Sequence, residues 1–453
     1  LETVVLPTNL DDFSGWCIFR NCRNLKNIAI PENVTEIPNG TFINCSSLAA
    51  ITIPQGVSEI GSNVFYGCSS LTSIEIPEGV KYLYEQVFYG CTALESVKLP
   101  QNLFQIGKNC FYNCGALSDI SLPSSIEIIG EGAFYNCENL ASPTLPTSLR
   151  TLVKSAFQYC RNITTIVLPD GVASIPESCF YGCSSLESVT IPEGVTAIGE
   201  RAFFGCNLNA LTLPESLETI GIYAFCNNSS LKSVNIPAKV KTIGKQAFYD
   251  CGLTDLVIPE GVQTIGSHAF YRNSLQNLTL SSTVTSIGGS AFGNNNNLQS
   301  IICNAATPPT LGDDAFYGCN IQEVKVPLAS IAAYKQANGW KDFTNYYGGD
   351  VVNNGITYRI NENGATITAA EATLTEANIP SSVEFEGNQY PVIKINSSVF
   401  SGNTNLTAVT LSAGLVEIGG FAFKGCQNLE SVALPESLTT LGDYAFSSCK
   451  LLK

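Results

Sequence analysis

Cysteine is the residue type in this sequence with the widest capacity for chemistry. The chain of 453 residues contains 18 cysteines. Thirteen of them stand three residues after a recurring phenylalanine, and Asn228, Asn273, Asn295 and Asn403 take that place in four further copies. Cys and Asn are both small and can hydrogen-bond the backbone of a tight turn, the thiol weakly and the amide well. This exchange favours buried free thiols, and no two cysteines have the C-x2-C spacing of a zinc site.

Disulfides remain the alternative for these cysteines. We call the position three residues after each recurring phenylalanine, which holds Cys or Asn, a station. In a stacked array neighbouring stations would lie ~4.8 Å apart, and such a separation is compatible with a disulfide. A pairing scheme would leave a cysteine without a partner wherever the station holds Asn, so we predict free thiols. The compartment therefore cannot be inferred from the cysteine content.

Eight tyrosines are the candidate binding residues, and each directly follows a recurring phenylalanine. They are Tyr66, Tyr89, Tyr112, Tyr135, Tyr181, Tyr249, Tyr271 and Tyr317. A ladder of such amphipathic rings could stack on sugars or contact a protein partner. The same ladder could instead serve the fold, each ring covering the next, because a position that repeats usually stabilises the repeat. We prefer the structural interpretation and leave the partner-binding residues open.

Acidic residues and the lone histidine give little support for catalysis. A Ser-His-Asp arrangement could form only at His268. Acidic residues that follow a strand-ending proline could hold Ca²⁺ if stacked, but Gln55 and Gln101 interrupt their column. The outward positions of the predicted strands hold mostly short polar side chains, without the acidic cluster that glycan cleavage needs. We predict a protein that is not an enzyme and that has no cofactor and no metal.

The composition narrows the classes of partner. The chain has 23 Lys and Arg against 38 Asp and Glu, a net charge of -15, which argues against a nucleic-acid partner. No apolar run approaches the ~18 residues of a membrane helix, so we predict no membrane span. The sequence has no methionine, which suggests a piece of a longer protein whose signal peptide and anchor lie elsewhere.

All of these residues stand on a repeat of 23 residues. Each copy combines a strand pattern, Leu-x-x-Ile-x-Ile-Pro, with a glycine corner and a phenylalanine. One copy buries too little apolar surface to fold alone, so the copies must stack around a shared core. We predict an α/β solenoid with one short parallel strand per ~23-residue coil and with the phenylalanines stacked. Three departures predict local irregularities: Pro143, Cys303 and a turn after Cys206 that is one residue short.

The repeat is interrupted once, which predicts four parts. Residues 1–326 form the first array. Residues 327–349 form its C-terminal cap, with a short helix between an N-cap at Ser330 and a stop at Gly339. Residues 350–396 form a small β module with hairpin turns at Asn363-Gly364 and at 386–388, and this module caps the next array. Residues 397–453 form a second, truncated array.

The unit C-x-x-L-x-x-I-x-I-P-x-x-V-x-x-I-G-x-x-A-F, as at 45–65 and 183–203, resembles the repeat of the BspA-like family of bacterial surface proteins. The stretch VPLASIAAYKQANGWKDF is similar to the closing segment of such arrays. The resemblance implies a curved leucine-rich-repeat solenoid, export to the cell surface, and adhesion to host matrix proteins, host cells or other bacteria. It supplies no catalytic residues.

We therefore predict a monomeric, extracellular or surface-attached bacterial protein that binds a protein or glycan ligand on a host or bacterial surface. A passive spacer that presents another domain is the first alternative. A glycan-binding or glycan-cleaving solenoid is the second.

Overall fold

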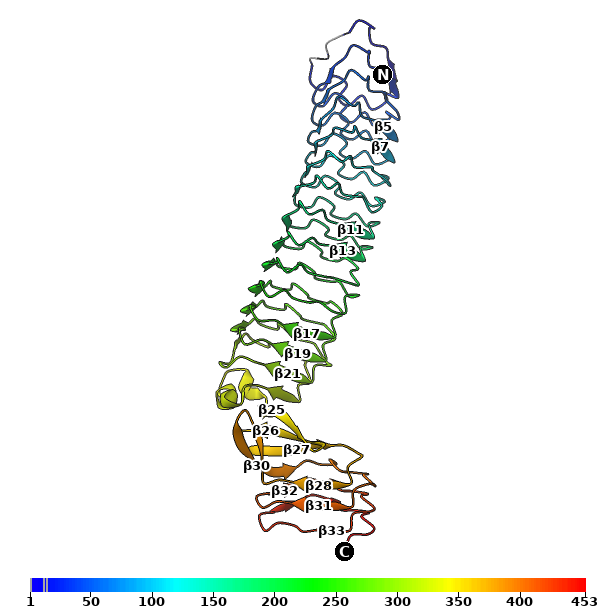
Figure 1. Ribbon diagram of the computed structural model, residues 1–453. Coiled ribbons are helices and arrows are strands. Elements are labelled where there is room, and N and C mark those ends of the chain that lie inside the picture. The colour runs from blue at the N-terminus through cyan, green and yellow to red at the C-terminus, as the bar shows by residue number, and fades with distance from the viewer. Residues whose placement is uncertain (1, 11–12, 14) are drawn as a thin grey trace. The chain divides into compact units, whose positions relative to one another are not determined.

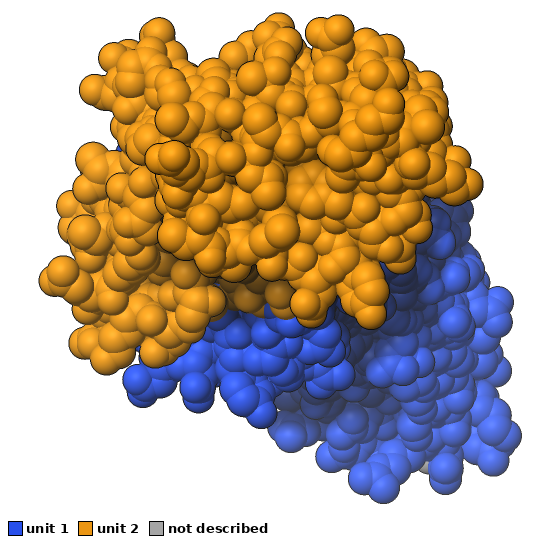
Figure 2. All heavy atoms as spheres, turned by 90° about the horizontal axis from the view of Figure 1, so that it is seen from below, with its two compact units in different colours: residues 1–298, 311–320 blue, residues 299–310, 321–453 orange. Residues whose placement is uncertain are grey.

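The computed structural model describes residues 2–10, 13 and 15–453. It divides into two compact units, unit 1 (Leu1–Leu298 and Leu311–Asn320) and unit 2 (Gln299–Thr310 and Ile321–Lys453), which Figure 2 shows in different colours. Figure 1 shows the strands of successive turns. The described chain is a solenoid with parallel strands, little helix and a small mixed sheet near its C-terminal end. The predicted solenoid class is confirmed, whereas the part limits at 326, 349 and 396 remain predictions.

The first strand of each turn follows the predicted Leu-x-x-Ile-x-Ile pattern. Neighbouring turns pair in parallel at equivalent residues, as Ser73 does with Ser96. Alternation buries Ile74 and leaves Ser73 and Glu75 outside, which matches the pattern of the sequence. In unit 1 these strands are β1 (Thr3–Val4), β2 (Asn27–Ile28), β5 (Ser73–Glu75), β7 (Ser96–Lys98), β11 (Thr165–Val167), β13 (Ser188–Thr190), β17 (Asp255–Ile258) and β19 (Asn277–Leu280).

Most turns of unit 1 have a second strand, of two residues, which the sequence analysis did not predict. Its second residue is inward, as Ile106 is in β8, and a glycine usually follows. A Cβ on Gly107 would lie 2.6 Å from the carbonyl oxygen of Leu83, so the preceding turn leaves no room for a side chain there. These strands are β3 (Glu36–Ile37), β4 (Glu59–Ile60), β6 (Tyr82–Leu83), β8 (Gln105–Ile106), β9 (Ile128–Ile129), β10 (Thr151–Leu152), β12 (Ser174–Ile175), β14 (Ala197–Ile198), β15 (Thr219–Ile220), β16 (Thr242–Ile243), β18 (Thr264–Ile265), β20 (Ser286–Ile287) and β22 (Thr310–Leu311).

A stack of phenylalanine rings forms the centre of the core. Phe134, Phe157 and Phe180 are fully buried, and their ring centroids are 5.2 and 5.6 Å apart with nearly parallel planes. The residues around each phenylalanine form a tight turn instead of a helix, and the N–H of Phe157 donates to the carbonyl of Cys179 in the next turn. The predicted stacking of phenylalanines is confirmed.

The Cys and Asn stations perform the same task. The thiol of Cys160 donates to the carbonyl of Phe134 at 3.0 Å, and the amide of Asn228 donates to the carbonyl of Phe203 at 2.9 Å. Both side chains are fully buried, where a polar side chain without a hydrogen bond would be costly. The shared ability to hydrogen-bond the backbone therefore explains the exchange of the two residue types.

At three of its four positions, Asn replaces Cys where the preceding turn is one residue short. In a full turn the N–H of the strand leucine donates to its own cysteine carbonyl, as Leu71 does to Cys68. In the short turn after Cys206 the N–H of Leu208 instead donates to the side-chain oxygen of Asn228, at 3.1 Å. Asn273 and Asn295 accept the corresponding N–H groups of two further short turns. A thiol lacks this strong acceptor, so the shortened turn requires the amide.

The other two predicted irregularities have different outcomes. The residues around Pro143 form no strand, and the hydroxyl of Ser142 accepts the N–H groups of Thr164 and Thr165 at 3.0 Å. Cys303 lies at the end of a regular strand and is fully buried. The prediction is confirmed at Pro143, because proline cannot donate to the ladder, and is wrong at Cys303, because a thiol fits the place of an aliphatic side chain.

In unit 2 a short helical cap lies between the second and third of three parallel strands. The strands are β21 (Ser300–Cys303), β23 (Glu323–Lys325) and β24 (Tyr346–Tyr347), and the cap contains η1 (Leu328–Ser330), α1 (Ile331–Tyr334) and η2 (Trp340–Asp342). Ser330 is the N-cap residue of α1, but its side chain makes no capping bond. The helix ends at Tyr334, with Lys335 as its C-cap, and not at Gly339, which is the N-cap residue of η2. The hydroxyl of Tyr334 donates to the carbonyl of Ala305 at 2.7 Å, which ties the cap to the turn before it.

The β module supplies strands to both sheets of the second array. Both predicted hairpins are present, and β27 and β28 each pair in parallel with a later strand. One sheet runs β25 (Gly349–Asn353), β26 (Ile356–Asn361), β27 (Gly364–Ala370), β30 (Asn388–Ile395), β32 (Glu417–Ile418) and β34 (Thr440–Leu441), with β29 (Ser382–Phe385) paired to β30. The other runs β28 (Glu376–Ile379), β31 (Ala408–Leu411) and β33 (Ser431–Val432).

Candidate binding surfaces

Four of the eight candidate tyrosines form a continuous stack in unit 1. The rings of Tyr66, Tyr89, Tyr112 and Tyr135 lie 4.3 to 4.7 Å apart, with planes within 3° of parallel. All four side chains are half-buried. Each inner ring is covered on both faces by its neighbours. The ladder therefore presents hydroxyls and ring edges to a partner, not the open ring faces on which a sugar would stack.

The other candidates do not continue this stack. Tyr159 inserts edge-on between Tyr135 and Tyr181, with interplanar angles of 88° and 85°. Tyr249 and Tyr271 form a separate pair 5.3 Å apart. Tyr317 is 65% exposed. The structure thus divides the predicted ladder into separate groups, and a binding role for these eight residues stays a prediction.

Burial raises the pKa of three of the candidate tyrosine hydroxyls. It raises the pKa of Tyr112 to about 12, and the neighbouring hydroxyl of Tyr135 adds to this shift. Burial likewise raises the pKa of Tyr89 and Tyr181. These phenols can donate or accept hydrogen bonds at neutral pH, but they have no nucleophilic character.

Most of the thiols are buried. All 18 cysteines lie in the described part of the chain and are free. Burial raises the pKa of the Cys45 and Cys183 thiols to about 12, and the neighbouring Cys22 thiol adds to the shift at Cys45. Nucleophiles and metal ligands are thiolates, so these groups are inert at neutral pH. Residues 2–10, 13 and 15–453 contain no group of three His, Cys, Asp or Glu side chains placed to hold a metal ion.

The acidic residues that follow the strand-ending prolines, such as Glu78 and Glu260, accept backbone hydrogen bonds from the following turn. Glu78 accepts the N–H of Gln101 at 2.9 Å. Glu260 accepts both the N–H and the hydroxyl of Ser282 at 2.9 Å, and these hydrogen bonds lower the pKa of Glu260. Each of these carboxylates therefore bonds the turn next to it, and they do not converge on a common point.

His268 is packed against a ladder tyrosine. Its ring centroid lies 5.2 Å from that of Tyr271. Its Nδ1 is buried and has no hydrogen-bond partner among the described residues. A catalytic imidazole needs a carboxylate or carbonyl to orient this nitrogen, so the geometry does not supply a triad.

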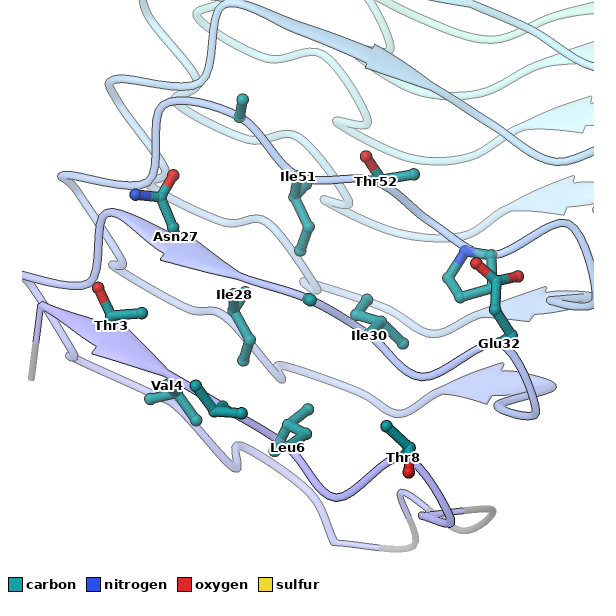
Figure 3. A pocket seen from close by; sticks show the side chains of 14 residues that line it. Thr3, Val4, Leu6, Thr8, Asn27, Ile28, Ile30, Glu32, Ile51 and Thr52 are labelled. Atoms are coloured by element: carbon teal, nitrogen blue, oxygen red, sulfur yellow. The ribbon is translucent and has the colours of Figure 1, made fainter.

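The strand face of unit 1 has two shallow hollows near the first turns. One, of about 640 Å³, is lined mainly by apolar side chains that include Val4, Leu6, Ile28 and Ile30, as Figure 3 shows. The other, of about 650 Å³, is lined mainly by polar residues such as Ser73, Ser96, Asp119 and the ion pair of Glu75 with Lys98. The polar character predicted for this face holds at the second hollow. Two outward valines farther along, Val167 and Val257, are 63% and 61% exposed and were not predicted.

A cluster of three aromatic residues on the second strands is the clearest departure from the repeat. Tyr82 and Tyr84 are 41% and 38% exposed, and their ring centroids are 6.1 Å apart. Phe104 of the next turn packs edge-on against Tyr82 at 5.9 Å. We call Tyr82, Tyr84 and Phe104 the aromatic patch. In the other turns of the first array the three equivalent positions hold no aromatic residue.

The surroundings of the aromatic patch are acidic. Burial raises the pKa of Tyr84, and the carboxylates of Glu59 and Glu36 add to this shift, which places both near the ring. Residues 32–131 contain ten Asp and Glu but three Lys and no Arg. Lys81, next to Tyr82, is one of these lysines and is exposed. Sequence reasoning missed the patch because it examined columns that repeat, whereas these aromatic residues are absent from the neighbouring turns.

Comparison with known proteins identifies the repeat. The model of the BspA-type leucine-rich repeat region matches residues 14–120, 104–232, 218–337 and 370–453. No curated protein is significantly similar in sequence. None of the helices in the described chain is long and apolar enough to cross a bilayer.

Two solved structures are similar to this chain. A leucine-rich repeat protein from Bacteroides ovatus is 24% identical, with a TM-score of 0.40, and the alignment covers 100% of this chain and 85% of that chain. A leucine-rich cell surface protein from Faecalibacterium prausnitzii is 23% identical, with a TM-score of 0.35, and the alignment covers 100% and 86%. The family is therefore identified by the repeat model.

Proposed function

This chain belongs to the BspA-type leucine-rich repeat family, and from that premise we propose that it is a non-enzymatic binding protein of the bacterial cell surface. We further propose that it binds a protein partner through the aromatic patch. The observation that carries this proposal is the exposure of Tyr82 and Tyr84 at positions where the repeat itself uses no aromatic residue.

The core of the repeat does not require aromatic residues at these exposed positions. The inward residue of β6, Leu83, is fully buried, as the equivalent residue is in the neighbouring turns. The rings of Tyr82 and Tyr84 add nothing to that core because they point outward. Tyr and Trp side chains supply a large share of the binding energy of protein interfaces. An outward aromatic cluster is therefore better explained by a partner than by the fold.

The acidic surroundings indicate the chemistry of the partner. Glu36 and Glu59 lie opposite each other in register on β3 and β4, next to the patch. Lysine and arginine side chains of a partner would find both carboxylates and aromatic ring faces there. We therefore propose a protein surface or segment rich in Lys and Arg, which agrees in sign with the net charge of -15.

The test is a binding measurement on residues 1–453 with immobilised extracellular matrix proteins and with a lysine-rich peptide. A triple variant, Tyr82→Thr, Tyr84→Gly and Phe104→Thr, introduces the residues that other turns hold at these positions, such as Thr151, Gly107 and Thr196. We expect saturable binding to at least one of these probes and a loss of ~10-fold or more in the triple variant. The variant should fold normally because it restores the repeat.

The matched control is Tyr317→Gln, which removes a ring that is 65% exposed at a distant position and introduces the residue found at 158. This variant should bind like the parent chain. Absence of saturable binding to every probe would contradict the proposal and favour the spacer alternative. Equal binding by the parent chain and the triple variant would exclude the aromatic patch as the site.

A further inference from the structure

Unit 2 contains a polar pocket that the aromatic patch and the repeat do not explain. Its volume is about 240 Å³. Side chains from β23, β26, β27 and β30 line it, so it lies where the strands of the first array meet the β module. Figure 1 shows β26, β27 and β30 side by side in this module. Pockets for drug-sized ligands have volumes of ≈300 Å³ or more, so this pocket fits a smaller molecule.

Three of the lining residues, Arg359, Thr366 and Lys394, belong to a row of side chains in register across five adjacent strands. Asp350 lies opposite Arg359, Arg359 opposite Thr366, Thr366 opposite Lys394, and Lys394 opposite Glu417. The other face of the same sheet carries buried residues such as Ile360 and Ile367, which belong to the hydrophobic core. The alternation of the strands therefore directs every side chain of this row away from the core.

The cations of the row are held rigidly. Arg359 donates to Asp350 at 3.0 Å and to Glu323 at 2.5 Å, and its guanidinium lies 4.0 Å above the ring of Tyr347. Lys394 is paired with Glu417 at 2.9 Å. Fixed donors and acceptors of this kind lower the entropic cost of binding a small polar ligand.

Several polar side chains of the pocket make no hydrogen bond to the described residues. Thr366 is 92% buried and its hydroxyl makes no hydrogen bond to the described residues. The hydroxyl of Thr368 and the side-chain amide of Asn396 are likewise unused by the described protein. These hydroxyl and amide groups line the pocket and can both donate and accept hydrogen bonds, so they are suited to a ligand that does the same.

The charges decide between classes of ligand. The two cations, Arg359 and Lys394, are already paired with three carboxylates, those of Asp350, Glu323 and Glu417. A phosphate or carboxylate ligand would have to compete with these carboxylates for both cations. A neutral molecule with several hydroxyl groups would meet fixed acceptors, fixed donors and the free groups of Thr366 and Asn396.

We propose that this pocket binds a single neutral sugar ring, as part of a glycan or free. Recognition is through hydrogen bonds, because Arg359 covers the face of Tyr347 on which a ring would otherwise stack. This site is separate from the aromatic patch in unit 1, and its failure would leave the function proposed there untouched.

The test is titration of residues 1–453 with glucose, galactose, mannose and N-acetylglucosamine, and with glucuronate as the acidic probe, followed by NMR or calorimetry. We expect at least one neutral sugar to bind with a dissociation constant of ~1 mM and glucuronate to bind more weakly. Thr366→Val keeps the shape of the side chain and removes the buried hydroxyl. It should weaken binding ~10-fold, as expected for the loss of one buried hydrogen bond.

Thr357→Val is the matched control, because Thr357 lies on β26 outside the pocket. It should bind like the parent chain. Thr368→Val provides a second pocket variant in case Thr366→Val does not fold, and it should also weaken binding. The proposal would be overturned if no neutral sugar bound, if glucuronate alone bound, or if the folded pocket variants bound as tightly as the control.

Discussion

The tyrosine ladder and the aromatic patch are both built from aromatic residues on unit 1, but their surroundings differ. In the ladder, Tyr89 and Tyr112 are half-buried and stack 4.7 Å apart, each on rings of its own kind. In the patch, Tyr82 and Tyr84 are more exposed and are packed less closely, 6.1 Å apart. The ladder recurs along many turns, whereas the patch occurs once.

This difference separates two kinds of constraint on a solenoid sequence. A residue that recurs at every turn meets the same residue above and below, so its contacts are supplied by the repeat itself. A residue that occurs once has no such partner and must be explained by a local defect or by an external ligand. Asn228, Asn273 and Asn295 depart from the usual Cys because of a local defect, the short turn, and the aromatic patch is our candidate for an external ligand. Variants of repeated positions should therefore alter stability, and variants of unrepeated exposed positions should alter binding.

Alkaline pH should produce the largest effect on the repeated positions. Burial raises the pKa of thiols such as Cys45 and Cys183 from the ordinary value of 9.0 to about 12. The folded thiol keeps its proton between these values while the unfolded thiol releases it, so the free energy of unfolding is intact below pH ~9 and falls as the pH rises toward 12. Each such thiol contributes ~1.4 kcal/mol per pH unit in that window.

Denaturant unfolding at pH 7, 9 and 10 under reducing conditions measures this loss. The array should lose stability steeply above pH ~9. A variant with Cys91, Cys137 and Cys183 changed to Ser keeps a hydroxyl donor at each station, and its loss should be shallower. A stability that is unchanged between pH 7 and 10 would show that the thiols are not shielded as the structure describes.

Removal of one ring from the phenylalanine stack should have the next largest effect. Phe157 is fully buried between Phe134 and Phe180. Phe157→Ala leaves a cavity and should lower the free energy of unfolding by ~3–5 kcal/mol. Tyr84→Gly changes a residue of the aromatic patch, which does not recur along the array. It should change the free energy of unfolding by no more than ~0.5 kcal/mol. Chemical denaturation of both variants makes the comparison, and equal losses would contradict the distinction between the two classes.

Replacement of the amide at a short turn should have a smaller effect. Asn228→Cys keeps a donor to the carbonyl of Phe203 but leaves the N–H of Leu208 without its acceptor. The expected loss is ~1–3 kcal/mol, the cost of a buried N–H without a partner. Insertion of one serine between Asn207 and Leu208 in this variant rebuilds a full turn and should recover much of the loss. If the insertion lowered stability further, turn length would not explain the use of Asn.

The sequence was sufficient to predict the repeated features. The period alone predicted the stacked phenylalanines, and the alternation of Ser73, Ile74 and Glu75 predicted which side chains face inward. The exchange of Cys and Asn predicted a shared hydrogen-bonding role, which Cys160 and Asn228 confirm. These predictions succeed because in a solenoid each residue meets its own equivalent in the next turn, so contacts follow from register.

Features with a very short sequence signal, or with contacts between unlike parts of the chain, were not predicted. The two-residue second strands carry no pattern longer than one inward residue, which is too short for periodicity to reveal. The polar pocket requires Arg359, Thr366 and Lys394 to be in register, and the parallel pairing of β27 with β30 that provides it is not encoded locally. Spacing in the sequence also did not place Tyr82 beside Phe104.

The tyrosine ladder should give the smallest effect, and it offers the sharpest test of the comparison. Tyr112→Phe keeps the ring stacked between Tyr89 and Tyr135, so stability should change by less than ~0.5 kcal/mol. Tyr112→Ser removes two stacking contacts of ~0.5–1.5 kcal/mol each, and denaturant unfolding should detect this loss. Neither variant should weaken binding to the probes that the aromatic patch engages, because the ladder's ring faces are already covered. If Tyr112→Ser abolished binding while the chain remained folded, the ladder would be a ligand surface, and recurrence along the array would no longer indicate a purely structural role.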